Sequence, residues 1–183
     1  GAIGANGGRG SSPGAQRSGG GGRVAGILTG AGNGFAGFSG SLEAYSPTDY
    51  RGFPAGAGTI YKQTGDQYAA GVPGELVVDN GGNEADSPVL CTLMPDGIDI
   101  GDFAQVTITN EGILAVDNDN PVTWTNLVLR GSGGNTASLI VQGDDQVVYP
   151  ATLVVSNVLL ELWENPASLS NLVIATGGAL THR

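Results

Sequence analysis

The second half of the chain, Phe103 to Arg183, repeats one short pattern in which two apolar runs flank a corner rich in Asn, Gly or Ser. Copies of this pattern begin at Val106, Leu127, Leu153 and Leu172, so the steps between them are 21, 26 and 19 residues. Irregular repeats of about 20–50 residues, made of short β-runs and polar corners, are typical of solenoid proteins. The pattern therefore predicts a stack of short strands, with Leu127, Leu153, Leu160 and Leu172 pointing into its core.

Four further β-runs precede this half: Arg23 to Leu28, Phe38 to Tyr45, Thr59 to Gln63 and Gly74 to Asn80. They are rich in β-branched and aromatic residues and are bounded by Gly, Asn and Asp, as strands are. Polar and apolar residues alternate within them, which indicates one solvated and one buried face. Residues 84–102 break the rhythm, and we interpret them as an insertion or a lateral connection.

The amino-acid composition argues against a helical protein. The 183 residues include 33 glycines, and only 6% are aromatic, while glycine costs about 1 kcal/mol at each helical position. Residues 1–34 are so rich in glycine that their composition is that of a flexible linker. Glycine tracts become ordered only against a neighbouring surface. We therefore divide the chain into a segment 1–34, packed on the solenoid or on a neighbouring subunit, and a solenoid, residues 35–183.

The charge balance excludes some partners. Seventeen acidic and seven basic residues give a net charge of −10, so neither nucleic acid nor an anionic membrane is an expected partner. An acidic surface with one lysine, Lys62, is compatible with an extracellular or cell-surface location. The sequence contains no signal peptide, no membrane span and no initiator Met, so we expect a mature product or an excised piece. Cys91, the single cysteine, lies in an apolar run and is expected to be buried and inert.

Several segments together resemble a known class of protein. They are Gly19 to Ala25, Phe38 to Ala44, Gly56 to Tyr61, Gly74 to Asn80, Ser170 to Ile174 and Gly177 to His182. Their order is similar to that of Gly-rich parallel β-helix modules in very large bacterial surface and secreted proteins. The resemblance implies an all-β fold, a right-handed, single-stranded parallel β-helix, and a passive role in surface architecture. It implies no catalytic residues.

Acidic clusters are the main candidates for a binding site. Asp117 and Asp119 alternate with asparagines as calcium ligands do, although the Gly and distal Glu of a calcium loop are missing. They are the predicted metal site, for calcium, with a solvated turn as the simpler interpretation. Asp96, Asp99 and Asp102, and the pair Asp144-Asp145, are weaker candidates of the same kind. His182 is the only histidine, so the sequence offers too few ligands for a zinc site and no well-supported histidine for a Ser-His-Asp triad.

Two other functions remain open beside a structural one. Carboxylates on a β-helix are compatible with a polysaccharide-degrading enzyme. The repeats from Phe103 onward, however, contain few of the basic residues that usually accompany such carboxylates. We therefore predict no catalytic residues and no enzyme. The tyrosines and phenylalanines between residues 45 and 68 are compatible with a glycan-binding adhesin, although a small satellite core explains them more simply.

The sequence therefore predicts a structural building block of an extracellular filament, fibre or surface layer. The repeats end at Leu180 to Arg183 without a polar cap, so we expect an open strand edge there. Copies are expected to assemble head to tail through their ends, with the N-terminal segment of one covering the next. Surface glycans are a second possible partner.

Overall fold

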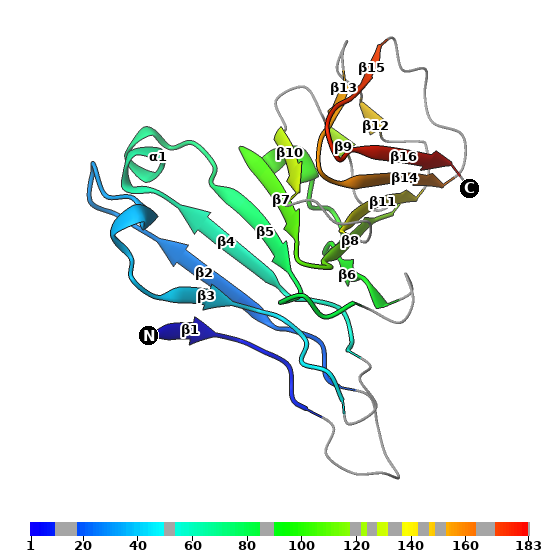
Figure 1. Ribbon diagram of the computed structural model, residues 1–183. Helices are drawn as coiled ribbons and strands as arrows, with labels where there is room; N and C mark the ends of the chain where they lie inside the picture. Colours follow the sequence, from blue (N-terminus) through cyan, green and yellow to red (C-terminus); the bar gives the residue numbers. More distant parts are fainter. Residues whose placement is uncertain are drawn as a thin grey trace.

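The computed structural model describes residues 1–9, 18–49, 54–84, 90–117, 122–123, 128–131, 137–142, 147–148, 153–163 and 171–182. Within these residues the chain is mainly β-strand, as predicted, and the strands form five sheets of two to five strands. Figure 1 shows two larger sheets that lie beside each other, with the shorter pairs at their margins.

The first large sheet has the strand order β10-β7-β5-β4-β2. Its strands are β2 (Arg23–Ile27), β4 (Thr59–Gln63), β5 (Glu75–Asp79), β7 (Gln105–Thr109) and β10 (Val128–Gly131). Strand β3 (Ser41–Glu43) pairs with β1 (Ala2–Gly4) in a separate two-stranded sheet near β2.

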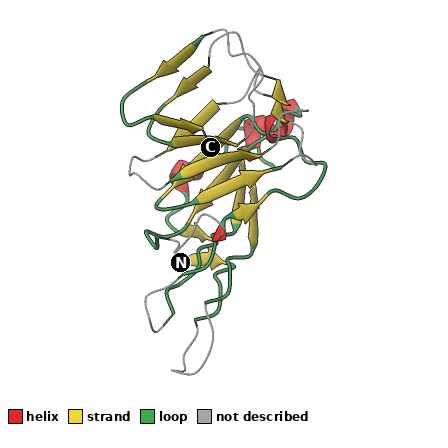
Figure 2. Cartoon of the chain, turned by 90° about the vertical axis from the view of Figure 1, so that its right-hand side faces the viewer, coloured by secondary structure: helices red, strands yellow, loops and turns green. Residues whose placement is uncertain are grey.

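The second large sheet has the order β16-β14-β11-β8-β6, and all of its pairings are parallel. Its strands are β6 (Thr92–Leu93), β8 (Ile113–Val116), β11 (Ser138–Gln142), β14 (Leu159–Trp163) and β16 (Ala179–His182). Two small parallel pairs complete the fold: β9 (Val122–Thr123) with β12 (Val147–Val148), and β13 (Leu153–Val155) with β15 (Leu172–Ile174). Figure 2 shows the strands of this half stacked one above another.

The main core lies between the two large sheets. Alternate residues of each strand face inward, such as Leu76 and Val78 of β5 and Leu114 and Val116 of β8. In the second sheet the fully buried Leu114, Leu139 and Leu160 stand beside one another on neighbouring strands. A second, smaller core covers the opposite face of the first sheet, where Ile60 and Val77 pack with Ala44 from the segment after β3.

The predicted right-handed, single-stranded parallel β-helix is wrong. The strands form several separate sheets, and β4 pairs with β5 in antiparallel orientation. The reversal occurs at a short helix, α1 (Gly65–Ala70), whose capping box joins Thr64 to Gln67 and whose last turn ends at Gly71 with φ 65°. Because glycine adopts this left-handed conformation without steric cost, the chain can turn back directly into β5. A β-helix that winds in one direction cannot continue through two consecutive antiparallel strands.

Two of the tight corners predicted in the second half are present, whereas most of the corner at 131–134 lies outside the described residues. Asn110 and Glu111 have φ values of 48° and 65° between β7 and β8, and Asn157 has φ 54° between β13 and β14. Of the four leucines predicted to face the core, Leu160 is fully buried and Leu172 packs against the core from a partly buried position. The structure does not describe Leu127 or the side chain of Leu153.

The described part of the Gly-rich segment lies against its own chain. Gly7 donates to Tyr45 O, Gly21 to Gly56 O and Gly22 to Ala5 O, so the extended segments around residues 5–8, 19–22, 44–46 and 56–58 are joined backbone to backbone. Residues 84–102, interpreted from the sequence as an insertion, include β6 and the short helix η3 (Ile100–Asp102). Leu93 of β6 is 65% exposed, whereas Ile100 of η3 is fully buried.

An ion pair links the antiparallel strands β4 and β5. Lys62 Nζ lies 2.9 Å from Glu75 Oε2, and Thr107 and Gln105 of β7 also donate to this carboxylate. Partial burial acts to raise the pKa of Glu75, but these donors and the charge of Lys62 outweigh it and hold the pKa below its ordinary value of 4.5. The ionised carboxylate is therefore favoured in the folded state.

We expect Glu75→Gln to reduce the acid sensitivity of the fold. A carboxyl group whose pKa is lowered by folding stabilises the protein above its unfolded pKa, and this contribution is lost as the pH falls through the folded value. The wild-type chain should therefore lose more stability than the variant between pH 7 and pH 3. Urea unfolding at a series of pH values measures the difference, and identical pH profiles would contradict the role assigned to Glu75.

Candidate functional site

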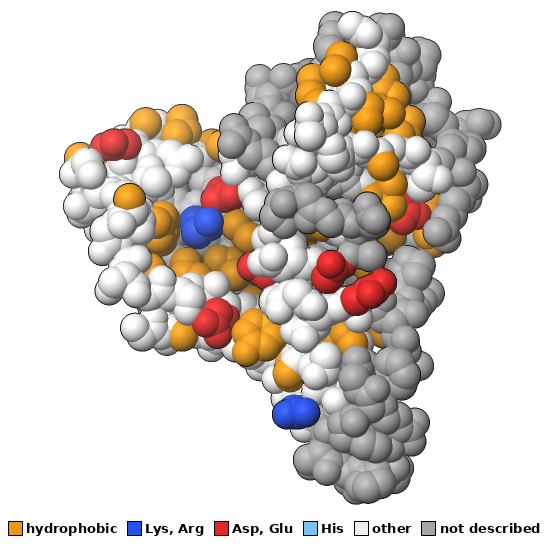
Figure 3. All heavy atoms as spheres, viewed as in Figure 1, with side chains coloured by type: hydrophobic (Ala, Val, Ile, Leu, Met, Phe, Trp, Pro, Cys, Tyr) orange, Lys and Arg blue, Asp and Glu red, His pale blue; other side chains and the backbone are white. Residues whose placement is uncertain are grey.

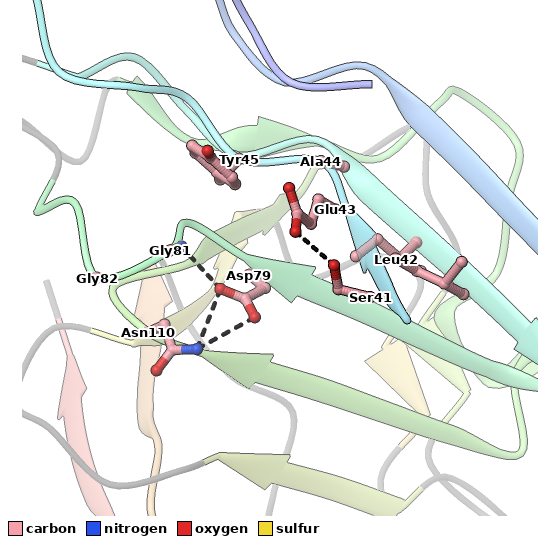
Figure 4. Close-up of a pocket in the computed structure, with 10 residues that line it drawn as sticks. Ser41, Leu42, Glu43, Ala44, Tyr45, Asp79, Gly81, Gly82 and Asn110 are labelled. Carbon is pink, nitrogen blue, oxygen red and sulfur yellow. Dashed lines mark hydrogen bonds between the residues drawn. The ribbon is translucent and has the colours of Figure 1, made fainter. Parts of the chain in front are cut away.

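A groove opens between β3 and the corners that follow β5 and β7. It has a volume of about 400 Å³, within the roughly 300–1,000 Å³ typical of small-molecule sites. Ser41, Glu43 and Tyr45 line one wall, and Asp79 and Asn110 line the other (Figure 4). Its remaining lining residues are Leu42, Ala44, Ile60, Gly81 and Gly82. The groove thus combines an apolar floor with polar groups on both sides.

Buried side chains hold the two walls in place. Asn80 is 1% exposed, and its Oδ1 accepts from Ser46 N at 3.0 Å while its Nδ2 donates to Asn83 O at 2.5 Å. It therefore ties the segment after β3 to the corner after β5. Asn6 supports the same wall from outside, because its Oδ1 accepts from Tyr45 N at 3.2 Å.

The polar groups of the groove are oriented by hydrogen bonds. Asp79 Oδ1 accepts from Gly81 N at 2.7 Å, and Asn110 Nδ2 donates to both oxygens of Asp79 at 3.1 Å. Glu43 accepts from the Ser41 hydroxyl and from Asn6 Nδ2. The hydrogen bonds from Ser41 and Asn6 hold the pKa of Glu43 below its ordinary value. Glu43 is therefore ionised at neutral pH and accepts, rather than donates, hydrogen bonds.

The predicted calcium site is described only in part. Asp117 directly follows β8, whereas Asp119 lies outside the described residues, so calcium at this corner stays a prediction. Within the part of the chain that the structure covers, no three or more His, Cys, Asp or Glu side chains gather as metal ligands would. The pair Asp144-Asp145 is also outside the described residues.

Asp99, another candidate from the sequence, has a structural role. Its Oδ1 accepts from Gly101 N and from Thr123 N, each at 2.8 Å, and its other oxygen accepts from the Thr123 hydroxyl. The carboxylate thus caps η3 and fastens it to β9, which leaves little capacity for a metal ion.

The described aromatic residues between positions 45 and 68 lie in different places. Tyr45 lines the groove, Tyr61 contacts Phe103 with ring centroids 6.2 Å apart, and Tyr68 is 51% exposed on α1. Tyr50 and Phe53 lie outside the described residues. Cys91 is partly buried, and burial raises the pKa of its thiol, which disfavours the reactive thiolate.

Beyond β6 at one end of the second large sheet and β16 at the other, no further described strand is paired. The β6 end is partly covered by its own chain, because Thr92 Oγ1 donates to Ala57 O at 2.6 Å and a Cβ on Gly56 would lie 2.7 Å from Leu90 O. Met94 N donates to Ala115 O of β8, and Ala179 N donates to Val158 O before β14. Because residues of a strand bond alternately to either side, the backbone groups of Leu93 and Leu180 face outward. The β16 edge can therefore accept a further strand, and at the β6 end the exposed Leu93 is available for contact.

Apolar side chains are exposed beside the β16 edge. Val154 of β13 and Val173 and Ile174 of β15 are 49%, 42% and 51% exposed, and Figure 3 shows hydrophobic atoms gathered over this end of the molecule. None of the helices in the described ranges combines the length and the apolar character needed to traverse a bilayer.

The comparisons with known proteins give no relative: no protein-family model, curated protein or solved structure matches this chain. The resemblance to Gly-rich surface modules therefore stays a prediction. The groove and the ends of the second large sheet are the features that bear on function.

Proposed function

We propose that this chain is a structural building block of an extracellular filament, fibre or surface layer. Its copies join head to tail by continuing the sheet that contains β6 and β16. The observation that carries the proposal is that this one all-parallel sheet ends at β16 with no further described strand and presents the exposed Leu93 at its other end.

The geometry of a parallel sheet supports a head-to-tail contact. All of its strands point in one direction, so β16 of one copy can add to β6 of the next and keep the same parallel pairing. Such a contact joins two different surfaces. It therefore propagates into an open filament unless the rotation between copies closes a ring.

The exposed apolar residues supply a second favourable contribution. Burial of Leu93 at one edge, and of Val173 and Ile174 near the other, would remove apolar surface from water. The chain carries a net charge of −10, so its copies repel one another at low ionic strength. We therefore expect assembly to strengthen when salt screens this repulsion.

The sequence predicted that the Gly-rich segment of one copy covers the next copy, but in this proposal the segment does not form the contact between copies. Its described residues are already bonded to their own chain, so they support the subunit that presents the edges. The acidic surface is compatible with the extracellular location that we propose.

Assembly can be measured with one edge variant and a matched control. Sedimentation velocity and electron microscopy of the intact chain should show species that grow with protein and salt concentration. Leu93→Lys places a charge on the β6 edge at a side chain that is already exposed, so it should prevent growth without unfolding the subunit.

The control is Val72→Lys, because Val72 is 44% exposed in the loop after α1 and lies away from both edges. This variant should assemble as the wild-type chain does. A wild-type chain that stays monomeric at every concentration, or equal assembly by Leu93→Lys, would contradict the proposal.

A further inference from the structure

We propose that the groove between β3 and the β5 and β7 corners binds a neutral sugar residue of a glycan. This activity is separate from assembly, because the groove residues belong to neither β6 nor β16. The proposal rests on the combination of groups in the groove, on how firmly they are held and on their charge.

The first argument is the acceptor capacity of the groove. A sugar hydroxyl can donate to a carboxylate oxygen that still has an open acceptor position. Asp79 already accepts from Gly81 N and, with both oxygens, from Asn110 Nδ2, so Glu43 is the main acceptor of the groove. An ionised carboxylate offers about four acceptor positions, and Glu43 uses two of them on Ser41 and Asn6.

The second argument is the apolar surface. Tyr45 stands on the wall opposite Asp79 (Figure 4), and Leu42, Ala44 and Ile60 are apolar lining residues of the groove. Sugar rings present C–H groups on their faces, which pack well against an aromatic side chain or an apolar floor. Pockets that bind small molecules typically have such an apolar lining with a few fixed polar groups.

The third argument is that the site is preformed. Gly81 adopts φ 63°, and a Cβ at this position would lie 3.1 Å from Cγ of Tyr45. The bare backbone of Gly81 lets the corner approach the tyrosine ring, while the buried Asn80 holds the segment above it. Little ordering cost therefore remains for the ligand to offset.

Charge narrows the class of sugar. Among the described lining residues two are carboxylates and none is Lys or Arg, so uronic acids and sulfated sugars are disfavoured by repulsion. Hydrolysis is also disfavoured, since a glycosidase needs a carboxyl group that stays protonated as the acid. The hydrogen bonds from Ser41 and Asn6 instead lower the pKa of Glu43 and favour its ionised form. The groove is therefore suited to hold a neutral sugar rather than to cleave it.

A bound cation is the competing interpretation of two nearby carboxylates. The Asn110 amide turns its nitrogen toward Asp79, which places donor hydrogens where a calcium ion would need an oxygen. Calcium alone is nevertheless included as a probe in the experiment.

The experiment is a titration of the intact chain with neutral mono- and oligosaccharides of glucose, galactose, mannose and N-acetylglucosamine. Binding is followed by calorimetry in the presence of a chelator. At least one of these sugars should bind, and Tyr45→Ala and Glu43→Gln should each weaken its affinity at least fivefold. Tyr68→Ala is the matched control, because Tyr68 is exposed on α1 outside the groove, and it should leave the affinity unchanged.

Thermal melts confirm that each variant is folded. If Tyr45→Ala does not fold, the decision rests on Glu43→Gln, which changes one atom of a solvent-accessible side chain. The proposal is overturned if none of the sugars binds, if binding survives both substitutions, or if calcium alone binds in a manner that depends on Glu43 and Asp79.

Discussion

Replacement of Leu139 with alanine is expected to lower the free energy of unfolding by about 2–5 kcal/mol. Leu139 is fully buried in β11 and stands between Leu114 of β8 and Leu160 of β14. The truncated side chain leaves a cavity in the core between the two large sheets, because neighbouring strands cannot collapse into it without disturbing their pairing. Urea or guanidinium denaturation, at concentrations where the chain is monomeric, measures the loss.

Leu93→Ala is the matched control for this substitution. It removes the same atoms, but Leu93 is 65% exposed on β6, and surface substitutions usually change stability by no more than about 0.5 kcal/mol. Equal losses for the two variants would show that β11 does not pack in the core as described.

A second large loss is expected from Gly21→Ala. A Cβ atom on Gly21 would lie 1.9 Å from Ala44 O and 2.4 Å from Gly58 N, so two extended segments would have to move apart. Overpacking of this kind costs about 1–3 kcal/mol and sometimes more. Glycine is required here by the close approach of three backbones.

Gly8→Ala tests whether that loss is specific. Gly8 belongs to the same Gly-rich segment, but a Cβ there would meet no atom within 4 Å. Where the backbone conformation is compatible, such a change has little effect or stabilises by up to about 1 kcal/mol. If Gly21→Ala were as harmless as Gly8→Ala, the close packing of the N-terminal segment would be wrong.

The positions of the strands could be predicted from the sequence to a large extent. The runs at Arg23, Thr59 and Glu75 form β2, β4 and β5, and the copies of the C-terminal pattern form β7, β8, β10, β11 and β13 to β16, whereas β9 and β12 were not predicted. Two local signals mark these strands: the alternation of apolar and polar residues, and the corners rich in glycine or asparagine. Both can be read from neighbouring residues without knowing the fold.

The arrangement of those strands could not be predicted in the same way. The recurrence of one short pattern suggested one continuous coil, whereas α1 reverses the chain and makes β4 and β5 antiparallel. The signal for this turn is present in the capping residues Thr64 and Gln67 and in Gly71. The helix is only six residues long, and a search for amphipathic helices overlooks so short a helix.

The groove was also missed, because its residues are distant in the sequence. Glu43, Asp79 and Asn110 come together only through the pairing of β5 with β7 and the position of β3 beside them. A signal existed in the two corners, since Asp79-Asn80-Gly81 and Asn110-Glu111-Gly112 each follow an apolar run. Stacking these corners at neighbouring strand ends would have placed Asp79 beside Asn110.

The most direct test of head-to-tail assembly is a mixture of two copies that are each blocked at one edge. Leu93→Lys blocks the β6 edge, and Thr181→Lys blocks the β16 edge at a partly exposed side chain. Sedimentation equilibrium should show that each variant alone is monomeric. An equal mixture should form dimers and nothing larger, because one variant keeps its β6 end and the other keeps its β16 edge without the blocking lysine. Filaments from either variant alone, or a mixture that stays monomeric while the wild-type chain assembles, would contradict assembly through these two edges.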